Sequence, residues 1–127
     1  MSKATAISLA QGFDSLTFAA NRKPDSTDIQ RAVCTLSEFR DGGVYLAHFA
    51  GVSAWERHPA GDELVMVCEG ETALSLILNG EEVIRELKAG ELIVVPAGTW
   101  HRFNSAGVKL MAVTPQPSDH QVEKPES

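Results

Sequence analysis

Four side chains in the middle of the chain have the chemistry and the spacing of a metal site. Glu56 and His58 lie two residues apart, Glu63 follows closely, and His101 lies further along the sequence. Imidazole nitrogen and carboxylate oxygen together suit divalent Mn, Fe, Ni or Zn, and the second carboxylate favours the harder Mn and Fe over Cu. An octahedral ion held by four protein groups still has positions for water or substrate. We therefore predict a divalent metal as cofactor.

Glu56 has two further interpretations. A carboxylate beside a metal, or inside an apolar barrel, can have its pKa moved toward neutrality and then abstract a proton, which makes Glu56 the candidate catalytic base. Alternatively, Glu56 forms a salt bridge at the mouth of the site, for example with Arg102. For the whole set, the competing interpretation is a metal-free pocket in which His58 and His101 only form hydrogen bonds.

The other His and Cys residues give weaker signals. His48 falls within a predicted strand, where a single His is more often a packed structural residue. His120 falls in a polar tail, and we assign it no function. Cys34 and Cys68 are too few for a disulfide framework or a thiolate zinc site, and they are typical of small buried residues in a reducing compartment.

Short strands separated by turn residues must bring the four side chains together. Segments typical of short strands cover residues 44–50, 53–58, 63–68, 72–78, 82–87, 92–95, 100–103 and 108–114. The clearest turn is Asn79-Gly80, because Asn-Gly accepts the positive φ of a type I′ hairpin turn. Strands at intervals of roughly ten residues are typical of an antiparallel barrel or jelly roll. The predicted fold class is all-β with an internal lumen.

Alternation along these strands predicts which side chains share the lumen. Successive strand residues face opposite sides, so Glu56 and His58 point one way while Trp55 and Arg57 point the other. Each of the other two candidate ligands shares its face with apolar residues: Glu63 with Val65 and Val67, and His101 with Phe103.

The first of these segments resembles the first motif of the cupin superfamily. That motif has a glycine, two histidines, a glutamate and a closing glycine at fixed spacings. Here Gly51, His58, Glu63 and Gly70 stand at the matching positions, and Glu56 replaces the first histidine.

The second segment resembles the second cupin motif. Gly90, Pro96, Gly98 and His101 match its glycine, proline, glycine and histidine, whereas Asn104 arrives one residue before the asparagine position. Together the two motifs fix seven or eight positions, which is more specific than a single glycine-rich pattern.

The resemblance implies a cupin-type double-stranded β-helix, or jelly-roll barrel, with a metal held inside it at the His and Glu positions. Similar families often dimerise and include isomerases, epimerases, dioxygenases, decarboxylases and sugar-binding modules, so the fold does not choose an activity. We expect a small metal-binding cupin that holds a small polar or acidic ligand, with Lewis-acid isomerase or oxygenase chemistry. The alternative is a non-catalytic binding or sensor protein, with or without metal. Whether the chain is an enzyme stays open.

Length and composition set the remaining expectations. The 127 residues fit one domain, which we divide into edge strands and loops (1–42), a barrel core (43–114) and a frayed polar tail outside the fold (115–127). The net charge of -6 disfavours nucleic acid and anionic membranes as partners. There is no signal-peptide pattern and no apolar run long enough to span a bilayer. We therefore expect a cytoplasmic protein, a homodimer, with a small-molecule ligand.

Overall fold

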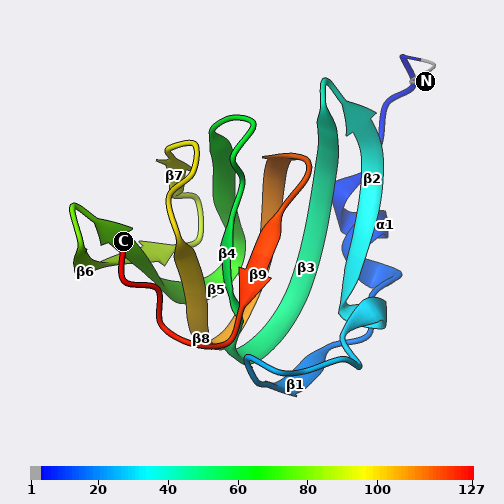
Figure 1. The fold of residues 1–127 in the computed structure, drawn as a ribbon. Coiled ribbons are helices and arrows are strands. Elements are labelled where there is room, and N and C mark those ends of the chain that lie inside the picture. Colours follow the sequence, from blue (N-terminus) through cyan, green and yellow to red (C-terminus); the bar gives the residue numbers. More distant parts are fainter. Residues whose placement is uncertain (1–3) are drawn as a thin grey trace.

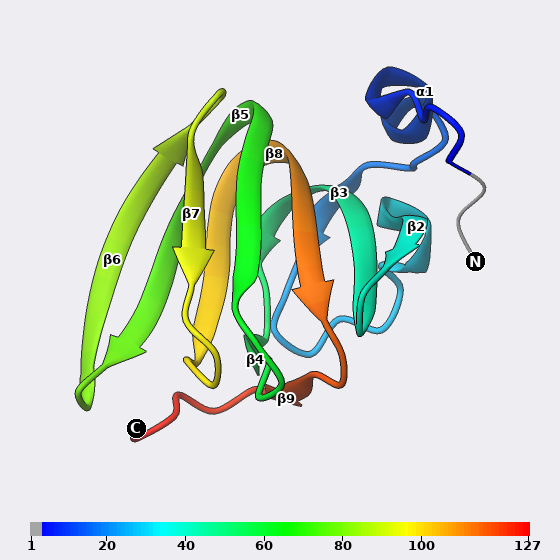
Figure 2. The same ribbon diagram turned by 90° about the horizontal axis from the view of Figure 1, so that it is seen from above.

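The structure, a computed structural model, describes residues 4–127, and within this range nine strands form one strongly curved sheet (Figure 1). The elements in chain order are α1 (Leu9–Asp14), β1 (Ala19–Arg22), η1 (Gln30–Ala32), β2 (Val33–Phe39), β3 (Gly42–Val52), β4 (Trp55–Arg57), β5 (Glu63–Leu78), β6 (Glu81–Lys88), β7 (Leu92–Val95), β8 (His101–Pro115) and β9 (Asp119–Gln121). Seen from above, the sheet runs from β6 at one end to β2 at the other (Figure 2). The all-β barrel expected from the sequence is confirmed.

Two long strands replace four of the predicted short ones. Segments 63–68 and 72–78 join into β5, and segments 100–103 and 108–114 join into β8. The two strands pair antiparallel along nearly their whole length, with register shifts near Gly70. Gly70 has φ +79°, and a Cβ there would lie 2.2 Å from the carbonyl oxygen of Gly107. This glycine therefore lets the strands bend past each other and continue, where the sequence indicated a turn.

The predicted Asn79-Gly80 hairpin is confirmed. It joins β5 to β6 as a two-residue turn flanked by the pair Leu78 and Glu81. Both turn residues have positive φ, 54° at Asn79 and 80° at Gly80, which is the type I′ geometry.

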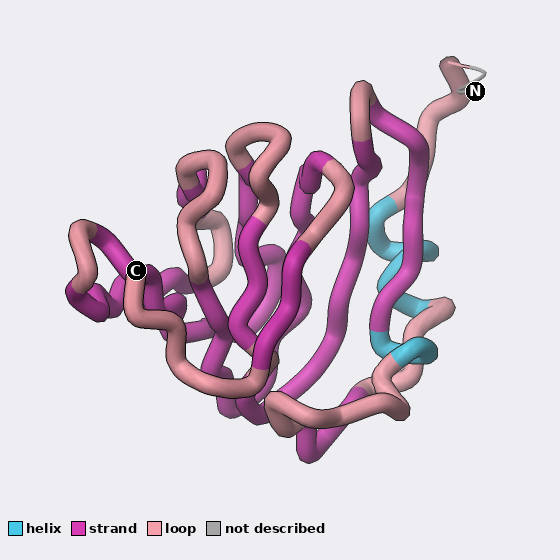
Figure 3. The backbone as a smooth tube through the Cα atoms, in the orientation of Figure 1, coloured by secondary structure: helices cyan, strands magenta, loops and turns pink. Residues whose placement is uncertain are grey.

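The N-terminal segment, where the sequence indicated edge strands and loops, contributes two strands and one α-helix. β1 pairs parallel with β3, and β2 pairs antiparallel with β3 on the same sheet. Helix α1 begins where the Ser8 hydroxyl accepts a hydrogen bond from the Gln11 amide, and it buries Phe13. Among the described residues, the helices lie only at this end of the chain (Figure 3). A short 3-10 helix, η1, leads directly into β2. The expectation of edge strands and loops also covers residues 1–3, which lie outside the residues that the structure describes.

The expectation of a frayed tail outside the fold is wrong. Residues 119–121 form β9, which pairs antiparallel with β4 so that His120 lies opposite Glu56. An ion pair of 2.8 Å between Arg57 and Asp119 ties the two short strands together. The proline-rich composition concealed a strand that closes one side of the barrel.

The barrel interior carries the main apolar core. Its fully buried members include Phe49 from β3, Val65 from β5 and Val108 from β8. A smaller cluster of Trp55, Ile77 and Trp100 lies apart from it, as expected for side chains of the opposite strand parity. Within residues 4–127, the only α-helix is six residues long, so no helix here reaches the length needed to cross a membrane.

Candidate metal centre

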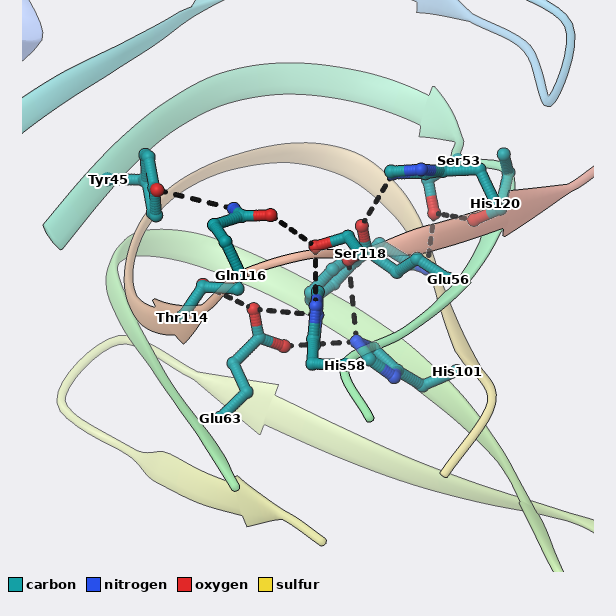
Figure 4. A network of polar contacts seen from close by, with 12 residues as sticks. Tyr45, Ser53, Glu56, His58, Glu63, His101, Thr114, Gln116, Ser118 and His120 are labelled. Atoms are coloured by element: carbon teal, nitrogen blue, oxygen red, sulfur yellow. Dashed lines mark hydrogen bonds and ion pairs between the residues drawn. The ribbon is translucent and has the colours of Figure 1, made fainter. Parts of the chain in front are cut away.

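The four side chains singled out in the sequence converge at one end of the barrel. Each offers one ligand atom, and the atoms from Glu56, His58, Glu63 and His101 all lie within 4.8 Å of one another. Glu56 comes from β4 with His58 directly after it, Glu63 begins β5, and His101 begins β8 (Figure 4). The predicted strand parity is confirmed, because Glu56, His58 and Glu63 all line one pocket.

The loop before β8 delivers His101 to this point. Gly98 has φ +75° and donates its amide hydrogen to the carbonyl oxygen of His58 over 3.0 Å. The amide of Ala97 donates to a carboxylate oxygen of Asp62 over 2.9 Å. Asp62 therefore fixes the loop from outside the cluster, which agrees with its opposite parity to Glu63.

Each histidine has its Nδ1 atom held by a neighbour. Nδ1 of His101 lies 2.9 Å from the carbonyl oxygen of Thr99, which can only accept, so Nδ1 carries the hydrogen. Nδ1 of His58 lies 2.7 Å from the hydroxyl oxygen of Ser118, which itself donates to Gln116 over 3.0 Å. Neutral rings arranged in this way present the Nε2 lone pair to the centre of the cluster. This support of ligand histidines by neighbouring polar groups is typical of metal sites.

Glu63 lies between the two histidines. Its Oε2 accepts a 2.6 Å hydrogen bond from the Thr114 hydroxyl and lies 3.2 Å from Nε2 of His58, while its Oε1 lies 3.0 Å from Nε2 of His101. Both Nε2 atoms and Glu63 Oε1 are buried, yet they have no hydrogen bond of good geometry within the described residues. Buried polar atoms are rarely left in this state. Their convergence fits a cation better than it fits a hydrogen-bond network.

Glu56 completes the cluster from a more open position. Its side chain is 20% exposed; Oε1 lies 3.4 Å from Nε2 of His101, and Oε2 lies 3.4 Å from Nε2 of His120. The suggested salt bridge to Arg102 is not formed, because that guanidinium stacks on Trp55 at 4.7 Å instead. One oxygen of Glu56 thus faces the centre and the other faces the tail strand.

The charges of the cluster stabilise one another. Burial lowers the pKa of His101, but its contacts with Glu56 and Glu63 outweigh burial and raise that pKa to about 10. Burial raises the pKa of both carboxyl groups, and their contacts with His101 outweigh this effect and lower both pKa values. A proton on His101 and a divalent ion therefore compete for the same nitrogen and oxygen atoms.

The cluster opens into a cavity of about 330 Å³. Its walls are largely apolar, with Phe49, Phe103 and Leu110 among them, and Arg22 and His120 add positive or titratable groups to the lining. Small-molecule sites usually combine an apolar wall with a few polar groups in this manner.

Sequence reasoning missed four residues that support the site. Thr114, Ser118 and His120 contact Glu63, His58 and Glu56 respectively, and Arg22 reaches the same pocket from β1. The tail gave no periodic signal, because residues 118–121 are all polar and the strand there is only three residues long. The remaining histidine, His48, packs against Phe18 at 4.6 Å, outside the cluster, as the structural interpretation expects.

Comparison with known families agrees with this geometry. The sequence profile described as "Cupin domain" matches residues 45–114, more than half of the chain and the whole of both motifs.

Among curated proteins, an uncharacterised protein of Bacillus subtilis, YdbB, is 41% identical over 71 residues, covering 56% of this chain and 60% of that protein. An acireductone dioxygenase of Rhodopseudomonas palustris is 37% identical over 60 residues, covering 46% of this chain and 36% of that protein. The match thus spans less than two thirds of either relative. A solved cupin-2 domain protein of Shewanella frigidimarina is 27% identical with a TM-score of 0.53, covering 66% of this chain and 79% of that one.

Proposed function

The chain belongs to the cupin domain family, and from this premise we propose that it binds a divalent metal ion through Glu56, His58, Glu63 and His101. The ion would hold a small polar or acidic ligand in the adjoining cavity. One observation carries the proposal: two imidazole nitrogens and a carboxylate oxygen are buried at one point without hydrogen bonds among the described residues.

The donor set and its support fit such an ion. Two nitrogen and two oxygen ligands without thiolate suit Mn, Fe, Ni or Zn. Thr99 and Ser118 hold the two rings so that their Nε2 atoms face the centre, and Thr114 holds Glu63. Similarity to a protein named acireductone dioxygenase supports an activity of the dioxygenase kind.

In a catalytic version of the site, the metal supplies Lewis acidity or a centre for oxygen chemistry. The protein's own residues orient and shield the ligand: Phe49 and Leu110 form an apolar wall that excludes water from the reacting end. The competing role for Glu56 is that of a base toward a bound ligand, because one of its oxygens is turned away from the centre. The sequence suggested a pKa moved toward neutrality, but burial is outweighed by contacts with His101 and His120, which lower the pKa of Glu56 and favour the ligand role over the base role.

A metal-free binding or sensor protein is the second candidate, and the charge balance of the cluster favours it. A protonated His101 between Glu56 and Glu63 already neutralises part of their charge, and its raised pKa reflects this. Such a pocket would bind the same small ligands without chemistry.

Metal analysis of protein purified without added metal, and again after loading with Mn, Fe, Ni or Zn, tests the proposal. We expect close to one ion per chain in the wild type and loss of the ion in His58→Ala and His101→Ala. His48→Ala is the matched control, because His48 packs against Phe18 away from the cluster. A wild-type protein that takes up none of the four metals would contradict the metal site.

A panel of carbohydrates, keto acids and diketones separates an enzyme from a binding protein. Turnover that requires the metal and is lost in His101→Ala supports an enzyme. Saturable binding without turnover supports the sensor alternative.

Assembly into a homodimer and a cytoplasmic location stay predictions. Three exposed apolar side chains on β6 and β7, namely Ile84, Leu92 and Val94, support the first of these. Light scattering on the purified protein measures the oligomeric state.

A further inference from the structure

Arg22 is a partly buried cation whose place in the fold the metal site does not explain. It ends β1 and lines the same cavity as Glu56 and His58. Its guanidinium carbon lies 4.6 Å from the centre of the Phe49 ring. Among residues 4–127, no carboxylate oxygen lies at ion-pair distance from the Arg22 guanidinium. Glu56 lines the same cavity, but its two oxygens face His101 and His120. A desolvated guanidinium with its donors unpaired is suited to bind an anion.

The backbone is built to bring Arg22 to this position. β1 lies against β3 with Arg22 opposite Gly51, the first glycine of the cupin-like motif. Gly51 has φ +112°, and a Cβ at that position would lie 2.1 Å from the carbonyl oxygen of Arg22. A side chain at residue 51 would therefore displace β1, so the glycine serves the close approach of Arg22.

We propose that Arg22 is the anion-binding residue of the pocket, and that the ligand carries a carboxylate for Arg22 in addition to the oxygen atoms that bind at the metal centre. The inference rests on the proposed metal site, because the metal end fixes the orientation of the ligand. The specificity would then be for a small acid with two oxygen-bearing ends separated by an apolar middle.

The charges around the cavity favour a single negative group at Arg22. A divalent ion formally balances the carboxylates of Glu56 and Glu63, so the guanidinium of Arg22 is a further positive charge in the lining, in addition to the titratable His120. Burial lowers the pKa of Arg22 and attraction to Glu56 opposes that effect, and the guanidinium stays charged. A carboxylate matches this one charge, whereas a phosphate dianion exceeds it.

The cavity also limits the size of the ligand. Its volume of about 330 Å³ lies at the lower end of small-molecule sites. Phe49 and Leu110 line it, so the part of the ligand between the two polar ends contacts apolar surface. Short-chain dicarboxylic acids with a chelating end have this shape.

Calorimetric titration of the metal-loaded protein with matched pairs of 2-oxo acids tests the inference. The oxo group and its neighbouring carboxylate bind a metal in all of these probes, and only one member of each pair has a distal carboxylate. The pairs are oxaloacetate with 2-oxobutyrate, 2-oxoglutarate with 2-oxopentanoate, and 2-oxoadipate with 2-oxohexanoate. The three chain lengths cover the range of spans between the metal end and Arg22. Phosphoenolpyruvate is added as the phosphate arm.

We expect at least one diacid to bind about tenfold more tightly than its partner, which corresponds to a charge-assisted hydrogen bond. Arg22→Gln should remove that preference while retaining the bound metal. Arg40→Gln is the matched control, because Arg40 stacks on the exposed Phe39 and does not line this cavity. It should leave the preference intact.

A preference for no diacid, or a preference that survives in Arg22→Gln, overturns the inference. Tighter binding of phosphoenolpyruvate than of every diacid overturns the carboxylate assignment. The failure of the metal site has a different signature, namely a wild-type protein without metal. In that case the same titrations are run on the metal-free protein. A diacid preference that is lost in Arg22→Gln supports the anion site. A wild-type protein without a diacid preference, or a preference that survives in Arg22→Gln, overturns it.

Discussion

The two sides of the candidate metal centre are built very differently. We define the inner wall as Glu63 and His101, which come from β5 and β8, strands of 16 and 15 residues that pair with each other for most of their length. We define the outer wall as Glu56, which lies in β4, and His58, which directly follows it. Strand β4 has three residues and pairs with the equally short β9.

The contrast extends to the exposure of the two carboxylates but not to that of the histidines. Glu63 is 5% exposed and Glu56 is 20% exposed, whereas His58 on the outer wall is buried like His101 on the inner wall. Long paired strands leave the inner wall little freedom to move. The outer wall is joined to β8 only where Glu56 lies opposite His101 and otherwise depends on a short tail strand, so its geometry can adjust. The departure from the cupin motif, Glu56 in place of histidine, lies on the side that can accommodate a change of side chain.

Glu63→Ala should have the largest effect, because it removes the carboxylate that contacts both histidines and Thr114. We expect metal affinity to fall by more than about a hundredfold, beyond the range seen when only a supporting residue is lost. Competition with a chromophoric chelator measures this loss. Glu69→Ala is the control, since Glu69 is an exposed residue of the same strand that pairs with Lys109. Equal affinities in the two variants would contradict the assignment of the inner wall.

The residues of both walls were predictable from the sequence, but the strand β9 that supports the outer wall was not. Alternating apolar residues around Glu63 and His101, together with the turn residues that precede His101, are enough to indicate that the two side chains share a face. The partner of β4 was missed because proline lowers the apparent strand propensity of 115–127. A strand of three residues has too few alternations to stand out, and its pairing is decided by contacts such as Arg57 with Asp119 that depend on the fold.

Glu56→Ala tests whether the outer-wall carboxylate is equivalent to the inner one. We expect a tenfold to hundredfold loss of metal affinity, smaller than for Glu63→Ala, because Glu56 contacts one of the two ligand histidines and is partly hydrated. Glu56→His restores the residue of the cupin motif and should recover affinity. If Glu56→Ala binds metal as well as the wild type but loses turnover of a substrate from the panel, Glu56 is a base and not a ligand.

Ser118→Ala tests the support that the tail gives to the outer wall. The variant removes the hydroxyl that holds Nδ1 of His58, so the ring can rotate and its lone pair is no longer fixed. Loss of a residue that orients a ligand histidine should reduce metal affinity about tenfold. Ser37→Ala is the control, since its hydroxyl bonds only to the neighbouring backbone of β2. An unchanged affinity would show that His58 is oriented without the tail.

His120→Ala should have the smallest effect, and it separates two roles of β9. His120 contacts Glu56 at 3.4 Å and its side chain is 59% exposed, so it touches a candidate ligand only through the oxygen that faces away from the centre. If the tail supports the metal site mainly through Ser118, which precedes β9 and holds His58, then His120→Ala should change metal affinity by less than about threefold. An effect of this size is expected for exposed charged contacts. The same chelator competition measures it. A loss as large as that of Ser118→Ala would mean that Glu56 is held in place by the tail, and that both outer-wall residues depend on β9.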